Sequence, residues 1–264
     1  MYREHKDFEV PENENTKIWR YMDFTKFISL LETKSLFFAR SDKFEDPYEG
    51  RLNQVTIDFF KLQFNKGIPS DQSDLAFESF MKEVEESRKV ATINCWHMNE
   101  VESDAMWKLY LKNNEGIAIQ STFKRLCEAF SLTDSEINIG KVIYEDFNNY
   151  IFPLRGNLTA NFLVKRKSFE HEKEIRAIHW RVSRQFGWRN LGEGKFPIVD
   201  YGENIPVDIS TLIEKVYIAP NSPSWIKDLV KSMLTRYDLD SIPVKQSSLG
   251  SNIVEIRKTE NYLM

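Results

Sequence analysis

The chain has 264 residues, of which 41% are hydrophobic and 13% aromatic, so it can bury one large core or two small ones. Its 36 basic and 40 acidic residues leave a formal net charge of −4. This near balance excludes a global electrostatic attraction to nucleic acid or membranes. The two cysteines, Cys95 and Cys127, exclude a disulfide framework and a paired metal-ligand motif, which indicates a reducing compartment.

The N-terminal segment is polar and carries five acidic side chains before Lys17, so it lacks the apolar stretch of a secretory signal. No apolar run approaches the ~18 residues that would cross a bilayer, and we therefore expect a soluble, cytoplasmic protein. No linker composition or internal repeat divides the chain. We expect residues 1–15 to be flexible and residues 16–264 to form one domain.

In chain order, the pattern first predicts a strand at Lys17 to Met22 and then a helix capped by Asp23. A second strand is predicted at Ser35 to Arg40, and two helices follow at 51–66 and 74–89. Further strands are predicted at Val90 to Trp96, Gly116 to Gln120, Lys141 to Tyr144, Glu174 to Trp180 and Glu214 to Ala219.

Helices are also predicted at Ala105 to Leu111 and near 157–169. The clearest one follows Pro220, with Asn221 or Ser222 as its cap, and we expect Trp225, Leu229 and Met233 to be buried. Strands and helices alternate too irregularly for a doubly wound sheet, and no Gly-x-Gly-x-x-Gly or Gly-Lys-Ser motif is present. The sequence therefore predicts a single α+β domain with a mixed β core flanked by helices.

Three segments carry a resemblance to a known bacterial family. They are Trp19-Arg20-Tyr21 with Phe38-Ala39-Arg40-Ser41 and Phe44-Glu45-Asp46-Pro47-Tyr48-Glu49, then Cys95-Trp96-His97 with Met106-Trp107 and Tyr110, and finally Lys167, Phe169, Glu172, Glu174 and Arg176. In order and spacing the chain resembles domain-of-unknown-function family twenty-nine seventy-one. Members usually carry Asn where this chain has Glu45 and a small hydroxyl residue where it has His97. This family implies no activity.

Several of these residues have both a structural and a functional interpretation. Asp46 and Glu49 can cap the following helix or point from a loop into a cleft. Trp107 and Tyr110 can belong to a core face or form a stacking platform, and His97 can be a hydrogen-bonded structural residue or a general base. We expect the turn at Phe44 to Glu49 and the strand at Glu172 to Arg176 to line one cleft, with Lys167 nearby.

Glu172 and Glu174 lie two residues apart on a predicted strand, which would place both carboxylates on one face. They can form an exposed ladder with basic neighbours or serve catalysis. The order of Arg20, Ser41 and Glu172-x-Glu174 is similar to the Arg, Ser, Glu-x-Glu signature of ADP-ribosyltransferases. That resemblance implies an ADP-ribosyltransferase-like fold and NAD as substrate, with catalysis by Glu174 and Glu172. It also implies that Arg20 binds a phosphate of NAD and that Ser41 supports the nicotinamide side, and we add Tyr21 and Arg176 as further candidate cofactor-binding residues.

Two other functions remain open from the sequence. Residues 155–189 hold nine Lys or Arg against three Glu, a local balance of +6, and include aromatic residues that could stack on bases. This stretch could bind a nucleotide, nucleic acid or protein without catalysis, with residues 165–189 as the binding segment. The carboxylates Asp46, Glu49, Glu172 and Glu174 could instead hold Mg²⁺, although the histidine and carboxylate spacings match no metal motif, so we expect no metal.

Overall fold

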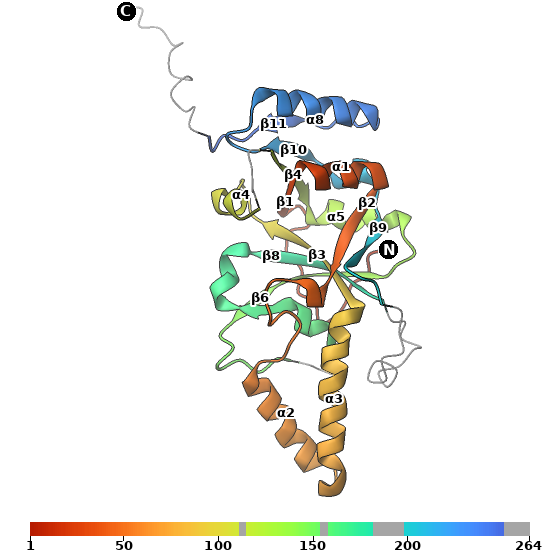
Figure 1. The fold of residues 1–264 in the computed structure, drawn as a ribbon, viewed down its shortest axis with the longest axis vertical. Helices are drawn as coiled ribbons and strands as arrows, with labels where there is room; N and C mark the ends of the chain where they lie inside the picture. The colour runs from red at the N-terminus through yellow and green to blue at the C-terminus, as the bar shows by residue number, and fades with distance from the viewer. Residues whose placement is uncertain (111–114, 154–157, 182–197, 251–264) are drawn as a thin grey trace, which may run out of the picture.

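The computed structural model describes residues 1–110, 115–153, 158–181 and 198–250. A mixed sheet runs through the body of the molecule (Figure 1). Its strands are β1 Lys17–Asp23, β2 Ser35–Arg40, β3 Ala91–Met98, β4 Gly116–Thr122, β5 Ile137–Lys141, β8 Glu174–Trp180, β9 Gly202–Pro206, β10 Lys215–Ile218 and β11 Val244–Gln246. Their order is β11-β10-β4-β1-β3-β2-β9, and β8 pairs with both β3 and β5. The predicted α+β class is confirmed.

Helices flank this sheet, and a second, two-stranded parallel sheet packs beside β8. The small sheet joins β6 Ile143–Glu145 to β7 Val164–Arg166. The α-helices are α1 Phe24–Thr33, α2 Gln54–Gly67, α3 Ser70–Val90, α4 Asp104–Tyr110, α5 Phe123–Ala129, α7 Ile209–Leu212 and α8 Ser224–Arg236. Short 3-10 helices lie at η1 Ser41–Lys43, η2 Phe130–Leu132, η3 Leu158–Leu163 and η4 Lys167–Glu172. Figure 1 shows α2 and α3 projecting from the body as a helical hairpin. None of the described helices has the length and apolarity needed to cross a membrane.

Two strands share one edge of β3 and leave a gap between them. β1 pairs with β3 only as far as Trp19 opposite His97, whereas β2 pairs near the other end, where Ala39 lies opposite Ile93. We call this gap, at Asn94 and Cys95 of β3, the fork. Polar backbone groups must find partners when strand pairing stops, so side chains are expected to fill such a gap.

Side chains from β1 and β3 fill the fork. Arg20 of β1 donates from Nη1 to the carbonyl oxygen of Cys95 at 2.6 Å. Asn94 donates from Nδ2 to the carbonyl oxygen of Phe37 in β2 at 2.9 Å. The fork therefore places the charged guanidinium of Arg20 against the middle of β3. The sequence predicted the strand β1 that carries Arg20, but it did not predict this contact.

The largest core lies on one face of the sheet, where Trp96 and Ile175 meet residues of α1, α5 and α8 such as Phe27, Leu126 and Val230. The other face carries smaller clusters. One packs Ile93 and Ile178 under Phe162 of η3, and another packs Trp19 and Tyr21 under Trp107 of α4. Because directly paired residues share a face, His97 with Glu174 and Cys95 with Arg176 lie on this second face. It is the face on which the candidate site is built.

Local signals predicted several elements well. The strands Ser35–Arg40 and Glu174–Trp180 have the predicted bounds, and Asp23 caps α1 by accepting a hydrogen bond from the Lys26 N–H at 2.7 Å. The predicted strand at Lys141 to Tyr144 covers the end of β5 and the start of β6. The sequence did not predict α5, β9 or β11.

Three predictions were wrong in ways that matter for the site. The helix expected near 157–169 is replaced, within the described residues, by η3, β7 and the start of η4. Helix α8 begins after Pro223 without a side-chain cap, and it buries Ile226, Val230 and Leu234, while Trp225 is 54% exposed. Helix α2 is capped by Asn53, whose side chain accepts from the Thr56 N–H, and not by Asp46 or Glu49.

Residues 1–15, which the sequence predicts to be flexible, lie along the body and contact it. The N-terminal ammonium donates to the carbonyl oxygen of Thr133 at 2.7 Å, and the Arg3 N–H donates to the carbonyl oxygen of Ile137 in β5 at 2.8 Å. Phe8 is buried in the cluster beneath η3. These contacts, and above all the burial of Phe8, attach the N-terminal segment to the sheet. In the sequence, the many acidic residues around Phe8 make this apolar anchor hard to recognise.

Candidate functional site

A buried guanidinium occupies the centre of the candidate site. Arg176 of β8 is fully buried and forms a two-pronged ion pair with Glu49, at 2.5 Å from Nη1 to Oε1 and 3.0 Å from Nη2 to Oε2. Its Nε donates to Glu174 Oε2 at 2.5 Å, and its Nη1 also donates to the carbonyl oxygen of Phe162 at 2.6 Å. Arg176 therefore joins the loop before α2, the strand β8 and the helix η3 through charge-assisted bonds.

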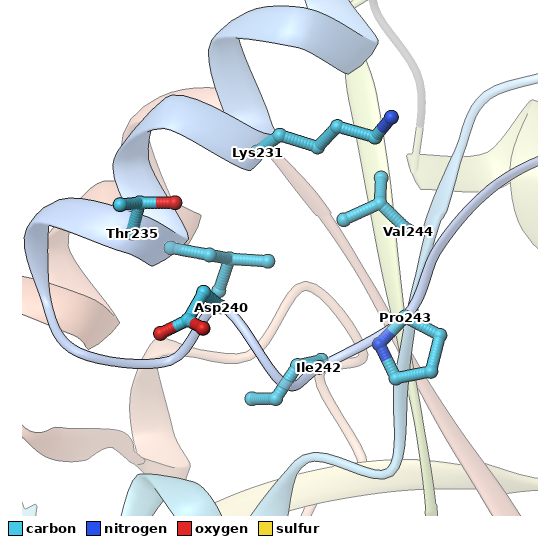
Figure 2. Close-up of a pocket in the computed structure, with 7 residues that line it drawn as sticks. Lys231, Thr235, Asp240, Ile242, Pro243 and Val244 are labelled. Atoms are coloured by element: carbon cyan, nitrogen blue, oxygen red, sulfur yellow. The ribbon is translucent and has the colours of Figure 1, made fainter.

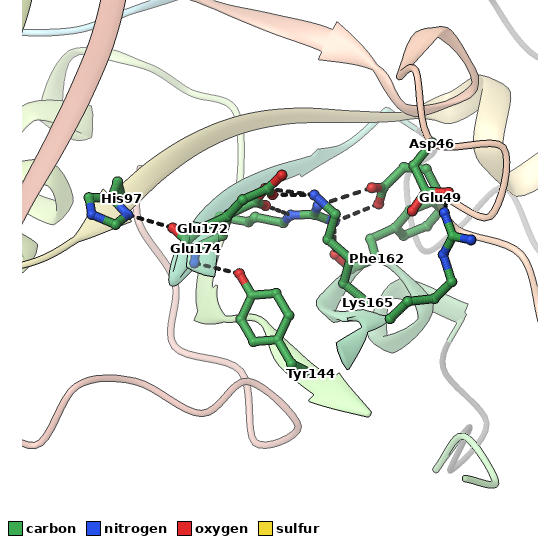
Figure 3. Close-up of polar contacts among 10 residues, drawn as sticks. Asp46, Glu49, His97, Tyr144, Phe162, Lys165, Glu172 and Glu174 are labelled. Carbon is green, nitrogen blue, oxygen red and sulfur yellow. Dashed lines mark hydrogen bonds and ion pairs between the residues drawn. The ribbon is translucent and has the colours of Figure 1, made fainter. Parts of the chain in front are cut away.

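Lys165 of β7 joins a second pair of carboxylates to this centre. Its Nζ contacts Glu172 and lies 3.0 Å from Glu174 Oε1. The side chains of Lys165 and Glu174 are 9% exposed, and that of Glu172 is 12% exposed. We call Glu49, Lys165, Glu172, Glu174 and Arg176 the charged network (Figure 3). All five side chains are largely buried. In the interior of a protein, an ion pair is stable only if its partners are well placed.

Glu172 and Glu174 meet, but not through the strand geometry that the sequence predicted. Glu172 ends the 3-10 helix η4, and β8 begins only at Glu174. Between them, Lys173 adopts a left-handed backbone conformation with φ of 41°. This turn brings both carboxylates to Lys165. A left-handed conformation is unfavourable for a residue other than glycine, so contacts around Lys173 must hold its backbone in place.

Backbone bonds hold the junction between η4 and β8. The hydroxyl of Tyr144, from β6, accepts the N–H of Glu174 at 2.7 Å, and the Val142 N–H donates to the carbonyl oxygen of Glu174 at 2.9 Å. His97 donates from Nδ1 to the carbonyl oxygen of Glu172 at 2.6 Å. Figure 3 shows His97 and Tyr144 approaching the junction from different sides. The two glutamates are thus held at their backbone as well as at their carboxylates.

The electrostatics separate the two glutamates. Burial raises the pKa of Glu172, and the neighbouring Glu174 raises it further, more than Lys165 lowers it. Burial also opposes ionisation of Glu174, but Arg176, Glu172 and Lys165 outweigh it and hold the pKa of Glu174 well below its ordinary value. These directions make Glu174 the stronger acid of the pair and Glu172 the carboxylate that holds a proton more readily.

The histidine beside this pair is neutral. Burial lowers the pKa of His97, and Lys173 lowers it further, against the opposing effect of its bond to the Glu172 carbonyl. Since Nδ1 donates that bond, Nε2 carries the lone pair, and this buried atom has no hydrogen-bond partner among the described residues. His97 is thus a fixed neutral imidazole at the edge of the network.

Several predicted site residues gather around Cys95, at the fork. Arg20 donates to its carbonyl, and Arg176 lies opposite it in the sheet register. Burial raises the pKa of the Tyr110 hydroxyl, and nearby Cys95, Glu174 and Glu172 raise it further, which places that hydroxyl within electrostatic range of the network. The half-exposed ring of Tyr110 comes from α4. The structure thus brings together predicted residues from β1, α4, η4 and β8.

Other predicted residues lie elsewhere or serve the fold. Ser41 is fully buried, and its hydroxyl donates to the carbonyl oxygen of Arg88 at 2.8 Å, so it is enclosed under α3. Trp107 is a core residue that contacts the edge of Tyr21, with ring centroids 4.9 Å apart. The Tyr21 hydroxyl accepts the N–H of Ser103 at 2.8 Å, so Tyr21 of β1 supports α4, and Trp107 of α4 packs onto it.

The turn at Phe44 to Glu49 and the strand β8 do meet, as expected, but through the buried Glu49–Arg176 pair. Asp46 pairs instead with Arg166 at 2.9 Å, outside the network. Lys167 pairs with Glu170 at the surface, where their side chains are 60% and 56% exposed. The two segments that the sequence pointed to therefore meet. Asp46 and Lys167 lie outside the charged network, and Lys167 lines a pocket beside Tyr48 and Arg166.

Sequence reasoning missed Lys165 and Tyr144. Tyr144 lies on β6 and Lys165 on β7, and the two residues are directly paired in the register of this small sheet. The sequence did not predict that these two strands pair. Alternation in Val164-Lys165-Arg166 was the available signal, because it places Val164 and Arg166 on the face opposite Lys165. The predicted helix across this region hid that signal.

Two shallow pockets lie outside the charged network. One, of about 310 Å³, lies between the end of α8 and β11 and is lined by residues such as Lys231, Asp240 and Pro243 (Figure 2). The other, of about 410 Å³, borders the network through β7, with Tyr48, Phe147 and Arg166 in its wall. Arg166 stacks on Tyr48 with its guanidinium carbon 4.8 Å from the ring centroid. Its charge is already balanced by Asp46.

The basic stretch 165–189 is largely neutralised where the structure describes it. Five of its six described Lys and Arg residues bind carboxylates: Lys165 with Glu172 and Glu174, Arg166 with Asp46, Lys167 with Glu170, Arg176 with Glu49 and Glu174, and Arg181 with Glu203. The sixth, Lys173, is exposed. Arg155, Arg184, Phe186, Trp188 and Arg189 lie outside the described residues. The described part therefore gives little support to a free anion-binding surface.

Metal binding gains no support from the described residues either, since no group of three or more His, Cys, Asp or Glu side chains among them is arranged to hold an ion. The carboxylates Glu49, Glu172 and Glu174 face cations of the chain instead. Comparisons of the chain with protein-family models, with curated proteins and with solved structures found no match. A function must therefore be inferred from the contacts of the site itself.

Proposed function

We propose that this protein is an ADP-ribosyltransferase-like enzyme that uses NAD, and that it belongs to domain-of-unknown-function family twenty-nine seventy-one. The observation that carries the proposal is the convergence, around Cys95, of Arg20 from β1, Tyr110 from α4 and the Glu172–Glu174 pair. A cation, an exposed aromatic ring and a carboxylate pair are the groups that a dinucleotide with a reactive glycosidic bond requires.

Arg20 suits the phosphates of such a substrate. One of its nitrogen atoms is bound to the Cys95 carbonyl, which fixes the guanidinium at the fork while leaving further N–H groups in its planar array. Burial lowers the pKa of Arg20, and the neighbouring Cys95 and Tyr110 partly oppose this effect, but guanidinium groups stay charged in proteins. We assign to Arg20 the binding of a phosphate of NAD.

Glu172 suits the reacting ribose better than Glu174 does. Both oxygens of Glu174 are already occupied, by Lys165 and Arg176, whereas Glu172 is the less enclosed of the two. Breaking the bond between nicotinamide and ribose develops positive charge on the sugar, and a fixed carboxylate beside it stabilises that charge. We assign this role to Glu172, with Glu174 holding Lys165 and Arg176 in place.

The charge count of the network is consistent with this assignment. Three carboxylates are in contact with two cations, so the network carries one negative charge in excess when Glu172 is ionised. An excess charge away from water is unfavourable, and a cationic sugar next to Glu172 would balance it. The site would therefore bind the transition state more strongly than the ground state.

The test is incubation of purified protein with NAD, together with cell-lysate protein and RNA as acceptors, and measurement of free nicotinamide and modified macromolecules. We expect nicotinamide release by the wild type and a loss on the order of a hundredfold in Glu172→Gln, the scale for removing one preorganised electrostatic group. Glu170→Gln is the matched control because Glu170 is exposed and pairs with Lys167 on the same short helix.

Two outcomes would contradict the proposal. Absence of NAD cleavage by the wild type under every acceptor condition would remove the enzymatic function. Equal nicotinamide release by Glu172→Gln and wild type would instead remove Glu172 from catalysis and leave the function itself standing.

A further inference from the structure

A single ammonium group joins the two glutamates of the site. Lys165 Nζ contacts Glu172 and lies 3.0 Å from Glu174, and its stem is buried with the ammonium 4.5 Å from the ring centroid of Phe169. Its register partner Tyr144 accepts the N–H of Glu174 through its hydroxyl. The small β6–β7 sheet thus presents a cation to the carboxylates and an acceptor to the backbone at one junction.

We propose that Lys165 is a positioning residue that holds Glu172 and Glu174 as one unit and sets how much negative charge Glu172 presents to a ligand. Its catalytic consequence rests on the proposed function, in which Glu172 faces the sugar of NAD. The coupling between Lys165 and the carboxylate pair stands on the contacts alone and can be measured without turnover.

The physical argument is one of charge balance. With Lys165 present, three buried carboxylates face two cations, and one proton on Glu172 makes the network neutral. Without Lys165, the same three carboxylates would face Arg176 alone, so a second proton would be needed for neutrality. Because an opposite charge at this range lowers a carboxyl pKa by about 1–3 pH units, removal of Lys165 must raise the pKa of Glu172 by a comparable amount.

Other titratable groups surround Glu172 and belong to the same balance. Lys165 itself stays protonated because Glu174 and Glu172 raise its pKa, although burial alone would lower it. The other titratable or charged groups lie on elements that pack against Glu172 or its partners. They are Arg20 of β1, His97 of β3, Tyr110 of α4, Tyr144 of β6, His171 of η4, the neighbouring Lys173, Arg176 of β8 and Glu49 before α2.

The experiment is a carbon-13 NMR titration of glutamate carboxyl groups in the whole chain, with the Glu172 signal assigned by its loss in Glu172→Gln. We expect the Glu172 titration to move upward by about 1–3 pH units in Lys165→Met, which keeps the length of the side chain without its charge. Lys165→Arg keeps the charge and should remain closer to wild type. Lys167→Met is the control because Lys167 is exposed and pairs with Glu170.

A Glu172 titration in Lys165→Met that coincides with that of the wild type would overturn the proposal. The variant should also fold at about pH 5, where protons replace the lost cation, and lose stability toward about pH 8. A Lys165→Met chain that is unfolded at both pH values would show that Lys165 acts through packing, and would likewise overturn it. If NAD is cleaved, the pH profile of nicotinamide release should shift with the NMR titration. Absence of cleavage would affect the proposed function and not this coupling.

Discussion

The charged network and the α2–α3 hairpin use the same residue types in opposite environments. At the base of the hairpin, Arg51 of the loop before α2 pairs with Glu85 of α3 at 3.2 Å, with about half of each side chain exposed. In the network, Arg176 and Glu49 pair at 2.5 Å, with 0% and 2% of their side chains exposed. Water already solvates the first pair, so its formation changes little, whereas the second has no other source of solvation. Ion pairs that look alike in a sequence therefore have very different consequences.

The largest expected difference between the two regions is in the cost of removing an arginine. Arg176→Met leaves Glu49 and Glu174 buried without a cation, and the free energy of unfolding should fall by about 3–5 kcal/mol. Arg51→Met, at the base of the hairpin, should cost about 0–1 kcal/mol. Urea unfolding of both variants measures these values. Similar losses in the two variants would show that burial does not distinguish the pairs.

A smaller contrast, with opposite signs, is expected from two glycines. Gly50, next to Glu49, has φ of 70°, and an added Cβ would lie 2.2 Å from a ring carbon of Phe162. Gly50→Ala should therefore destabilise the protein by on the order of 2–4 kcal/mol, through backbone strain and overpacking.

Gly67, at the end of α2, has no atom within 4 Å of an added Cβ. Gly67→Ala should stabilise by about 0.4–1 kcal/mol because it reduces the entropy of the unfolded chain. Thermal melts of the two variants give the comparison. A tolerated Gly50→Ala would mean that the loop before α2 can move away from η3.

The smallest expected effects are pH-dependent, and they again differ in sign. The folded state raises the pKa of Glu172, so its protonated form favours folding, and the associated stability is lost as pH rises from the ordinary pKa of 4.5 through the raised one. Glu172→Gln should therefore gain stability relative to wild type over this range. The gain should grow as pH rises from the ordinary pKa toward the raised one and level off above it.

Glu85 in the hairpin behaves in the opposite way. Burial opposes its ionisation, but Arg51 and Arg88 outweigh burial and lower its pKa. Its contribution is present above the ordinary pKa and is lost as pH falls, so Glu85→Gln should lose stability relative to wild type near neutral pH and not in acid. Solvent screening makes this effect small. Denaturant midpoints across the pH range test both variants, and parallel curves would contradict the assigned pKa directions.

The sequence by itself determined most of the backbone and the segments of the site. Alternating and periodic apolar residues predicted β2, β8 and α1, and the short polar side chain of Asp23 predicted the start of α1. These features depend on neighbours within a few residues. The resemblances to known families, and not these local patterns, pointed to Arg20, Tyr110 and the two glutamates as residues of interest, and the structure brings these together.

Only the tertiary structure decided which charged residues are buried and which faces pack. Glu49 and Arg176 are 127 positions apart, so no local pattern shows that the charge of each is stabilised by the other in place of water. Lys165 and Lys167 look alike in sequence, yet one is enclosed by carboxylates and the other lies in solvent. In α8, the series that begins at Trp225 and the series that begins at Ile226 are both apolar and both have helical spacing, so the sequence does not decide which of the two faces the core. Burial is a property of the partners that long-range folding supplies, and therefore the chemistry of the site emerged only with the fold.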